Sequence, residues 1–544
     1  MFRIGGIGPP VMLLGVLVLL HLCVMSIGEP FKNGDETRHV MTGVFVRDAL
    51  ADWHTSTADP REYAVKYYVQ YPALGIIIWP PFFYGVEGIA MWGFGTSYLV
   101  ARVVLYIFAI LAGVYAYRLF RFTHGSTTAL IASAAFGLAP LVFNYTDYVL
   151  LEIPALALVL GSIYHFEKYL KDTRSKDALL ACLLAALAAL TRFDAVILLP
   201  FVLFRLGFAR QFGALLRRPV IVGVLLALLL TVPYYLFTWR VYGAGIQHAA
   251  TSGASAAATS WLDVRNFYLY PSFIPEQIGW TGTVAAAFGM ICCLWRDRSG
   301  CGVYAALLTA TYLTLVPLAE PDARHAIYWV PALVLFAARG IVIAFGAHVR
   351  AMVVVVILLI CCLAFETIGP LRKNGWSTDY LTGTDEAASQ VLAKWSGELP
   401  IMYDGQLNGA FIYAIRRRDP QRRATVLRGD KILYSVYCDP TGGYEEYAKS
   451  DREVMELIHR YDPEYIIVED PEVFIQTPAG SRLRHVLREH PADYKLDDVI
   501  PFRTTMDSFA ASRLLVYRKL IRNPVRIPVS SLPVMAIQNT VTVK

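Results

Sequence analysis

Long apolar runs recur along the first two-thirds of this sequence, and they constrain the fold more than any other feature. A helix needs roughly 20 mainly apolar residues to cross a bilayer. Because 56% of the residues are hydrophobic and only 17% are charged, the sequence predicts an α-helical polytopic membrane protein with about eleven transmembrane helices. The runs lie at 10–28, 98–119, 126–143, 151–168, 178–192, 195–209, 219–239, 279–295, 303–318, 326–344 and 350–368.

The charges between these runs predict the orientation of the chain. The basic loops at 117–125, 165–177, 208–219 and 296–300 alternate with connections that carry fewer Lys and Arg residues. The positive-inside rule places the basic loops in the cytoplasm. No clear cleavage pattern follows the first run, so we expect it to remain as a transmembrane helix. The first outer loop and everything after about residue 369 then face the extracytoplasmic side.

One further apolar stretch, 71–95, does not fit this alternation. If it crossed the membrane, every later loop would change sides and the basic loops would face outward. Pro80 and Pro81 interrupt the stretch, and Glu87 adds a charge to it. We therefore expect helices that lie along the membrane interface, within the first outer loop.

The composition changes after residue 370. Helix-like stretches there, of which Thr384 is expected to cap the first, alternate with short β-like runs at 399–405, 424–429, 464–470 and 513–520. This alternation predicts an α/β domain. The chain thus divides into a transmembrane domain (1–370), a soluble extracytoplasmic α/β domain (371–520) and an extended or disordered tail (521–544).

The cysteines and the net charge indicate neither a metal nor a nucleic-acid partner. None of the eight cysteines forms a CxxC pair, so zinc held by thiolates is not expected. Most of them lie in or beside apolar runs, where cysteine usually serves as a small buried hydrophobe. The net charge of +6 is explained by basic cytoplasmic loops, so no nucleic-acid partner is expected.

Four acidic residues lie at the predicted outer ends of spans and are candidate catalytic residues. Asp35 and Glu36 follow the first span in "GDETRH", whereas Asp147 and Glu152 precede a later span in "NYTDYVLLEIPALAL". Adjacent carboxylates point to different faces of a helix, so one could act as a base while the other caps the helix or forms an ion pair. Acids that enter a membrane segment are costly and often mark function. An ordinary solvated helix start would explain the same residues.

Basic residues at the outer ends of the spans are candidate ligands for a phosphate group. Arginines that converge on one surface suit phosphate because they donate paired hydrogen bonds. Each could instead snorkel or pair with a local acid, as Arg192 could with Asp194 and Arg324 with Asp322. The five candidates are Arg102, Arg192, Arg240, Arg324 and His325.

The long outer connection 240–278 combines an Ala/Ser-rich stretch with aromatic residues and prolines. Such a composition suits a flexible lid over a site. An inert connector would explain it equally well.

The order of these charged and apolar segments along the chain resembles that of membrane glycosyltransferases of the GT-C fold. The most similar branches are the dolichyl-phosphate-mannose protein mannosyltransferases and the bacterial aminoarabinose transferases of lipid A. The resemblance covers about residues 10–345 and rests on "GDETRH", "YPALGIIIWPPFFYGVEGIAMWGFGTSYLVAR", "TDYVLLEIPALALVL", "LLAALAALTRFDAVILLP" and "EPDARHAIYWVPALVLFAARG". Members of the family commonly have a His or Asn with paired prolines where this chain reads "YPALGIIIWPP", so the first proline pair is broken here. The acid that heads the span, most often Asp in the family, is Glu152 with Asp147 nearby, and the choice between them stays open.

The resemblance implies an inverting glycosyl transfer. A hexosyl or pentosyl group would move from a polyprenyl or dolichyl monophosphate to an extracytoplasmic lipid, glycan or protein. Asp35 would act as general base on the acceptor hydroxyl or amine, and Arg102 and Arg324, helped by Arg192 or Arg240, would hold the phosphate. A metal is not obligatory for this leaving group. The acids Asp35, Asp147 and Glu152 could nevertheless converge on a divalent ion.

A polytopic transporter or lipid flippase is the main alternative, because it would use the same charged residues to bind its substrate. No internal repeat is evident, and the acids lie at span ends rather than at mid-membrane, so we favour the transferase. A scaffold with a sensory outer domain is a third interpretation. The expected absence of a cleaved signal and of a disulfide framework favours a bacterial inner membrane, and with it a role in cell-envelope, lipopolysaccharide or protein glycosylation.

Overall fold

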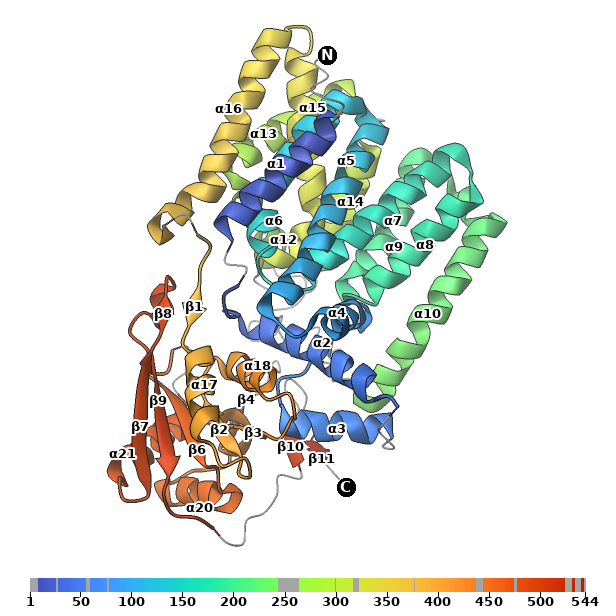
Figure 1. The fold of residues 1–544 in the computed structure, drawn as a ribbon. Helices are drawn as coiled ribbons and strands as arrows, with labels where there is room; N and C mark the ends of the chain where they lie inside the picture. Colours follow the sequence, from blue (N-terminus) through green and yellow to red (C-terminus); the bar gives the residue numbers. More distant parts are fainter. Residues whose placement is uncertain are drawn as a thin grey trace.

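The computed structural model describes residues 8–25, 28–54, 59–75, 78–242, 264–298, 300–316, 322–375, 377–436, 444–473, 477–523, 531–533 and 540–542. A helical bundle forms one end of the molecule, and a smaller part with a β-sheet forms the other (Figure 1). Most of the expected lid, residues 243–263, lies outside the described residues. The lid therefore stays a prediction.

The helical bundle confirms the predicted class of fold, because a helix or one limb of a helix coincides with each expected span. Five segments are long and apolar enough to cross a membrane: Tyr98–Gly137, Arg218–Arg240, Ile274–Arg296, Ala323–Phe345 and Val349–Asn374. The helices of the bundle are α1 (Pro9–Val24), α5 (Tyr98–Gly137), α6 (Pro140–Tyr145), α7 (Glu152–Asp172), α8 (Ser175–Ala189), α9 (Leu198–Ala209), α10 (Arg218–Tyr242), α12 (Val264–Ser272), α13 (Ile274–Arg296), α14 (Gly302–Leu315), α15 (Val330–Phe345) and α16 (Val349–Ile368). Short 3₁₀ segments η1 (Phe193–Ile197) and η4 (Ala323–Trp329) precede α9 and α15.

Helix α5 contains two of the expected spans, because the chain reverses at Gly125. This residue has φ +79° and ψ 176°, a conformation that glycine adopts without steric cost. Leu14 on α1 approaches Gly113 before the turn, and Leu17 approaches Gly137 after it. Both limbs therefore pack against α1.

Helices α13 and α15 cross at two glycines. A Cβ at Gly289 would lie 1.8 Å from the carbonyl oxygen of Phe336, and a Cβ at Gly340 would lie 2.4 Å from the Cα of Gly289. Small residues at such crossings let helix backbones approach closely inside a membrane. This crossing holds α15, and the η4 segment that precedes it, in a fixed position in the bundle.

Three helices of the first outer loop lie across the end of the bundle: α2 (Gly34–Asp52), α3 (Pro60–Gln70) and α4 (Phe82–Phe94) (Figure 1). None of them belongs to the segments that are long and apolar enough to span. The expected interfacial helices are thus present. They separate the bundle from the C-terminal domain.

A five-stranded sheet with the order β3-β2-β6-β9-β7 lies at the centre of the C-terminal domain. Strands β2, β3 and β6 run parallel, whereas β9 is antiparallel to β6 and β7. All four expected runs are strands. The sheet comprises β2 (Ile401–Asp404), β3 (Val426–Arg428), β6 (Tyr465–Asp470), β7 (Tyr494–Pro501) and β9 (Arg513–Lys519).

The helices of this domain are α17 (Thr384–Lys394), α18 (Asn408–Arg418), α19 (Gly429–Ile432), α20 (Asp451–Tyr461) and α21 (Pro478–Glu489). The expected cap of α17 was misplaced by one residue. Gly383 occupies the cap position, and its N–H donates to Glu386 Oε2 at 2.9 Å. Three short pairs complete the structure: β1 (Leu381–Thr382) with β8 (Arg503–Thr504), β4 (Tyr434–Val436) with β5 (Tyr444–Glu446), and β10 (Ser531–Pro533) with β11 (Thr540–Thr542).

Ion pairs attach the C-terminal domain to α2. Arg416 on α18 donates two hydrogen bonds to the Asp48 carboxylate, at 2.9 and 2.6 Å. Arg422 donates to both oxygens of Asp52, at 2.5 and 2.7 Å. The Arg416–Asp48 pair is almost fully buried, with 3% and 0% of the side chains exposed. The domain therefore rests on the helix that carries the first two candidate acids.

Candidate active site

Asp35 and Glu36 lie in the first turn of α2, where they have different environments. The Asn33 side chain caps the helix by accepting from the Asp35 N–H at 2.8 Å. Glu36 closes the capping box from the other side and accepts from the N–H groups of Lys32, Asn33 and Val149 at 2.9–3.2 Å. Glu36 has no exposed surface, whereas a third of the Asp35 side chain is exposed. The geometry thus makes Glu36 a buried cap and leaves Asp35 accessible to a substrate.

Arg324 connects Asp35 to Glu152, and Arg192 contacts Glu152 from the other side of the cluster. Arg324 lies 3.3 Å from Asp35 and 3.7 Å from Glu152. Arg192 forms an ion pair with the same Glu152 oxygen and lies 3.0 Å from Nδ1 of His325. The structure therefore brings five of the expected residues into one cluster, which we call the Asp35 cluster: Asp35, Glu152, Arg192, Arg324 and His325.

The local ion pairs weighed in the sequence are also present. Arg192 contacts Asp194 at 2.7 Å, and Arg324 contacts Asp322 at 2.8 Å. They do not compete with the longer-range contacts, since each guanidinium contacts more than one carboxylate. Glu152 Oε2 is buried and has no hydrogen-bond partner among the described residues. It can accept a hydrogen bond from a substrate.

The Asp35 cluster lies where several helices begin. Asp35 is in the first turn of α2, Glu152 is the first residue of α7, Arg192 precedes η1, and Arg324 is in the first turn of η4. Helix starts carry a positive partial charge from the aligned peptide dipoles. Together with two arginines, they form a site suited to an anion such as a phosphate.

Asp147 and Arg102 form a separate cluster. Lys32 Nζ donates to Asp147 at 2.5 Å, and Arg102 lies 4.0 Å from the same carboxylate. Arg102 also donates to the Glu29 carbonyl oxygen at 2.7 Å. At most 2% of the three charged side chains is exposed. Their mutual contacts hold Arg102 and Asp147 in the protein interior, and their expected roles at the substrate stay a prediction.

Arg240 lies apart from both clusters. It is exposed near the end of α10 and forms no ion pair with any described residue. The sequence placed it correctly at the end of a span. Helix α10 itself lies at the edge of the bundle (Figure 1).

Sequence reasoning assigned no role to two charged residues near the site. Arg38 donates to Asp35 at 3.0 Å, and Lys32 pairs with Asp147. The i,i+3 spacing of Asp35 and Arg38 on a helix could have revealed the first pair. Nothing in the sequence indicated the second, because it joins residues far apart in the chain.

The arginines keep Asp35 ionised. Burial raises its pKa, but Arg38 and Arg324 together outweigh this effect and lower the pKa below its ordinary value. The nearby His39 differs, because burial lowers its pKa to about 4. His39 is therefore neutral near pH 7, and its Nδ1 lies 2.6 Å from the Tyr84 hydroxyl.

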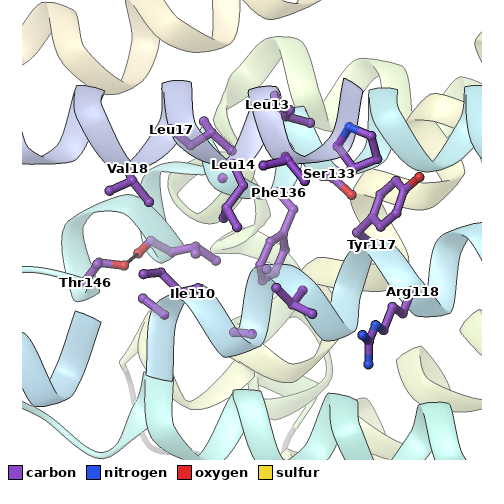
Figure 2. A pocket seen from close by; sticks show the side chains of 18 of the residues that line it. Leu13, Leu14, Leu17, Val18, Ile110, Tyr117, Arg118, Ser133, Phe136 and Thr146 are labelled. Atoms are coloured by element: carbon purple, nitrogen blue, oxygen red, sulfur yellow. Dashed lines mark hydrogen bonds between the residues drawn. The ribbon is translucent and has the colours of Figure 1, made fainter. Parts of the chain in front are cut away.

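A cavity of about 870 Å³ lies between α1, both limbs of α5 and the start of α7. Leu14, Leu17, Ile110 and Phe136 line its apolar wall, as Figure 2 shows. Arg118 and Arg121 line it too, near the turn of α5 that is remote from the Asp35 cluster. A space of this polarity suits a hydrocarbon chain rather than a sugar.

Comparisons with known proteins agree with this geometry. The family model described as dolichyl-phosphate-mannose-protein mannosyltransferase matches residues 80–237. No curated protein matches the sequence. The crystal structure of ArnT from Cupriavidus metallidurans bound to undecaprenyl phosphate is similar, with a TM-score of 0.57 and 13% identity, over 95% of this chain and 99% of that one.

Archaeal oligosaccharyltransferase structures are similar as well. The apo form of the Archaeoglobus fulgidus enzyme has a TM-score of 0.53 and 11% identity, over 84% of this chain and 69% of that one. The complex of AglB from the same organism with an inhibitory peptide and a dolichol-phosphate has a TM-score of 0.50 and 12% identity, over 85% and 69% of the two chains.

The chain is thus a multi-pass membrane protein with the GT-C fold of glycosyltransferases. The resemblance to the dolichyl-phosphate-mannose protein mannosyltransferases and the aminoarabinose transferases is confirmed.

Proposed function

We propose that this protein is an inverting glycosyltransferase that transfers a sugar from a polyprenyl-phosphate donor to an extracytoplasmic acceptor. One observation carries the proposal. A partly exposed, ionised carboxylate, Asp35, shares the Arg324 guanidinium with the buried Glu152 at a point where several helices begin. The site thus combines a proton acceptor with an anion-binding surface, and transfer from a lipid phosphate needs both.

In this mechanism, Arg324 and Arg192 hold the donor phosphate. Arg324 is 19% exposed and can reach a ligand, whereas Arg192 is 5% exposed and supports the site from within. The two guanidinium groups and the helix starts stabilise the negative charge that grows on the phosphate as the bond to the sugar breaks. Arg102 and Arg240 are not part of this proposal, since neither reaches the Asp35 cluster.

Asp35 acts as the general base in this proposal. In the described state, Arg324 pairs with Asp35 and lowers its basicity. A phosphate that binds Arg324 competes for the same guanidinium and weakens that pair. Asp35 then becomes a stronger base as the donor binds, and it accepts the proton of the acceptor hydroxyl or amine during attack on the anomeric carbon.

The acceptor approaches between α2 and the C-terminal domain in this proposal. Gly409 on α18 packs directly against Thr37, which lies within one turn of Asp35 on α2. This contact brings the C-terminal domain, which we expect on the extracytoplasmic side, close to the candidate base. The transfer assay distinguishes a lipid, glycan or protein acceptor, and a hexose from a pentose donor. We expect the protein to lie in a bacterial inner membrane.

No step of this mechanism needs a metal. The sequence allowed Asp35, Asp147 and Glu152 to converge on a divalent ion, but Asp147 belongs to the Lys32 and Arg102 cluster. Asp35 and Glu152 are both engaged by Arg324 instead. The three acids therefore do not form a common site among the described residues.

Transfer from a panel of polyprenyl-phosphate sugars to defined acceptors tests the function, with Asp35→Asn as the decisive variant. We expect Asp35→Asn to lower the transfer rate by about 10²–10⁴-fold, the usual contribution of a general base. Glu62→Gln is the matched control, because it removes an exposed carboxylate of α3 that pairs only with Lys66. Undiminished transfer by Asp35→Asn would remove Asp35 as base, and the absence of transfer by the unmodified protein from every donor would overturn the function.

A further inference from the structure

A second group of polar side chains lies at the opposite end of the bundle. The first limb of α5 starts at Tyr98 beside the interfacial helices and reaches His124 after about 40 Å of helix, at 1.5 Å per residue. Asp297 directly follows α13, and Cys301 directly precedes α14. One ligand atom of each of His124, Asp297 and Cys301 lies within 4.8 Å of the others. The mechanism proposed above uses none of these residues.

The separations between these atoms match those between ligands of one zinc ion. His124 Nε2 lies 3.8 Å from Cys301 Sγ and 3.7 Å from Asp297 Oδ2. Tetrahedral zinc with ordinary bond lengths places its ligand atoms about 3.4–3.8 Å apart. The contact between His124 Nε2 and Cys301 Sγ is a long sulfur hydrogen bond, which coordination of one ion by both atoms would replace.

The hydrogen bonds of His124 leave Nε2 ready to coordinate. The Thr123 hydroxyl donates to the Leu119 carbonyl oxygen at 2.9 Å. Its oxygen must therefore accept at its other contacts, which include His124 Nδ1 at 2.8 Å. The proton of the neutral imidazole then lies on Nδ1, and the lone pair of Nε2 faces Cys301 and Asp297. This is the usual arrangement of a metal-binding histidine.

Cys293 lies beside this cluster but does not belong to it. Its thiol interacts with that of Cys301, and only 2% of the residue is exposed. Arg339 on α15 donates to Asp297 Oδ2 at 2.7 Å. Carboxylates that bind metals are commonly oriented by such a hydrogen bond.

The predicted compartment favours a metal over a disulfide. The basic loops 117–125 and 296–300 place this end of the bundle in the cytoplasm, where thiols are kept reduced. One reduced thiol beside an imidazole and a carboxylate provides three ligands, and a water molecule can complete tetrahedral coordination. Such a set suits zinc more than magnesium or calcium.

We propose that His124, Asp297 and Cys301 form a zinc site that joins α5, α13 and α14 at the cytoplasmic end of the bundle. The sequence did not suggest it, because the ligands are distributed over three helices and no CxxC pair is present. Binding of zinc releases the thiol proton and links the turn at Gly125 to the loop between α13 and α14.

The metal content of the purified full-length protein in detergent tests this proposal. We expect zinc at about one ion per chain, and a thiolate-to-cobalt absorption band when Co²⁺ replaces it. Cys301→Ser and His124→Asn should each weaken zinc binding at least about tenfold. The control is Cys292→Ser, since Cys292 neighbours Cys293 in sequence but is not part of the cluster; it should bind zinc like the unmodified protein.

Two results would overturn the site. One is a cobalt-loaded protein without a thiolate band, a measurement that needs no variant to fold. The other is equal zinc retention by Cys301→Ser and Cys292→Ser, which would show adventitious metal. Cys301→His tests coordination directly, because it should retain zinc where Cys301→Ser loses it.

Discussion

At the scale of single residues, the environment of Asp35 differs from that of its neighbour Glu36. Both belong to one turn of α2, but three backbone N–H groups occupy Glu36 while Arg38 and Arg324 face Asp35. One carboxylate therefore holds the helix start, and the other remains accessible. Two residues that are adjacent in the sequence can therefore have different roles.

This difference predicts a shift in the pH dependence of transfer. Arg38 and Arg324 lower the pKa of Asp35, so the carboxylate form should persist below the pH at which an ordinary Asp becomes protonated. Arg38→Gln removes one of these charges, raises the pKa of Asp35 and should move the acid limb of kcat/KM to higher pH. Profiles of the variant and of the unmodified protein, measured with one donor, check this.

Arg47→Gln is the control for the pH experiment. It removes the same charge from α2, at a position that contacts Asp48 rather than Asp35. Its acid limb should coincide with that of the unmodified protein. If Arg38→Gln also left the limb in place, the group that limits transfer at low pH would not be Asp35.

At the scale of elements, α2 connects the two parts of the protein. Its first turn carries the candidate base, and its last turns carry Asp48 and Asp52, which hold the C-terminal domain. Its capping box determines where the helix starts, and its ion pairs attach the C-terminal domain to it. The position of Asp35 relative to the domain therefore depends on one helix.

Removal of Arg416 should loosen this attachment strongly. Arg416→Met leaves the buried Asp48 with fewer compensating charges, and breaking a buried pair in this way costs about 3–5 kcal/mol. Thermal unfolding in detergent should show a clear drop for Arg416→Met. The double variant Asp48→Asn with Arg416→Met should recover part of the loss, because no buried charge is then left uncompensated.

Arg452→Met provides the comparison for Arg416→Met. It disrupts the exposed pair with Glu456, whose side chains are 86% and 58% exposed. Pairs of this kind contribute about 0–1 kcal/mol. Equal destabilisation by the two substitutions would mean that the buried pair does not hold the domain.

At the scale of the whole molecule, the Asp35 cluster and the proposed zinc site lie at opposite ends of the bundle. The interfacial helices and the C-terminal domain share one end, and the turn at Gly125 lies at the other (Figure 1). Charge distribution assigns these ends to opposite sides of the membrane. The proposed transfer would then be extracytoplasmic, and the zinc site cytoplasmic.

Labelling of single introduced cysteines in intact cells tests this orientation. Glu456→Cys on α20 and Arg174→Cys in the α7–α8 loop replace exposed residues. A membrane-impermeant thiol reagent should modify Glu456→Cys from outside but should reach Arg174→Cys only after the membrane is opened. The reverse pattern would invert the topology and move the proposed transfer to the cytoplasm.

Local patterns were enough to predict much of this protein. Apolar length predicted the spans, the prolines and Glu87 predicted the interfacial stretch, and alternating β-like runs predicted strands β2, β3, β6 and β9. These features can be predicted from the sequence because they depend on residues that are close together in the chain. Asp35 and Arg324 could likewise be singled out as charges at span ends.

Only the tertiary structure decided which of those charges meet. Arg102 and Arg324 look alike in the sequence, yet packing encloses Arg102 with Lys32 and Asp147 and leaves Arg324 beside Asp35. His124, Asp297 and Cys301 come together because α5 reverses at Gly125 and α13 returns to the same end of the bundle. Sequence by itself determined the membrane class, the elements and the candidate residues. Helix packing determined the partners, since ion pairs and ligand sets form between residues that only the fold brings within a few ångströms.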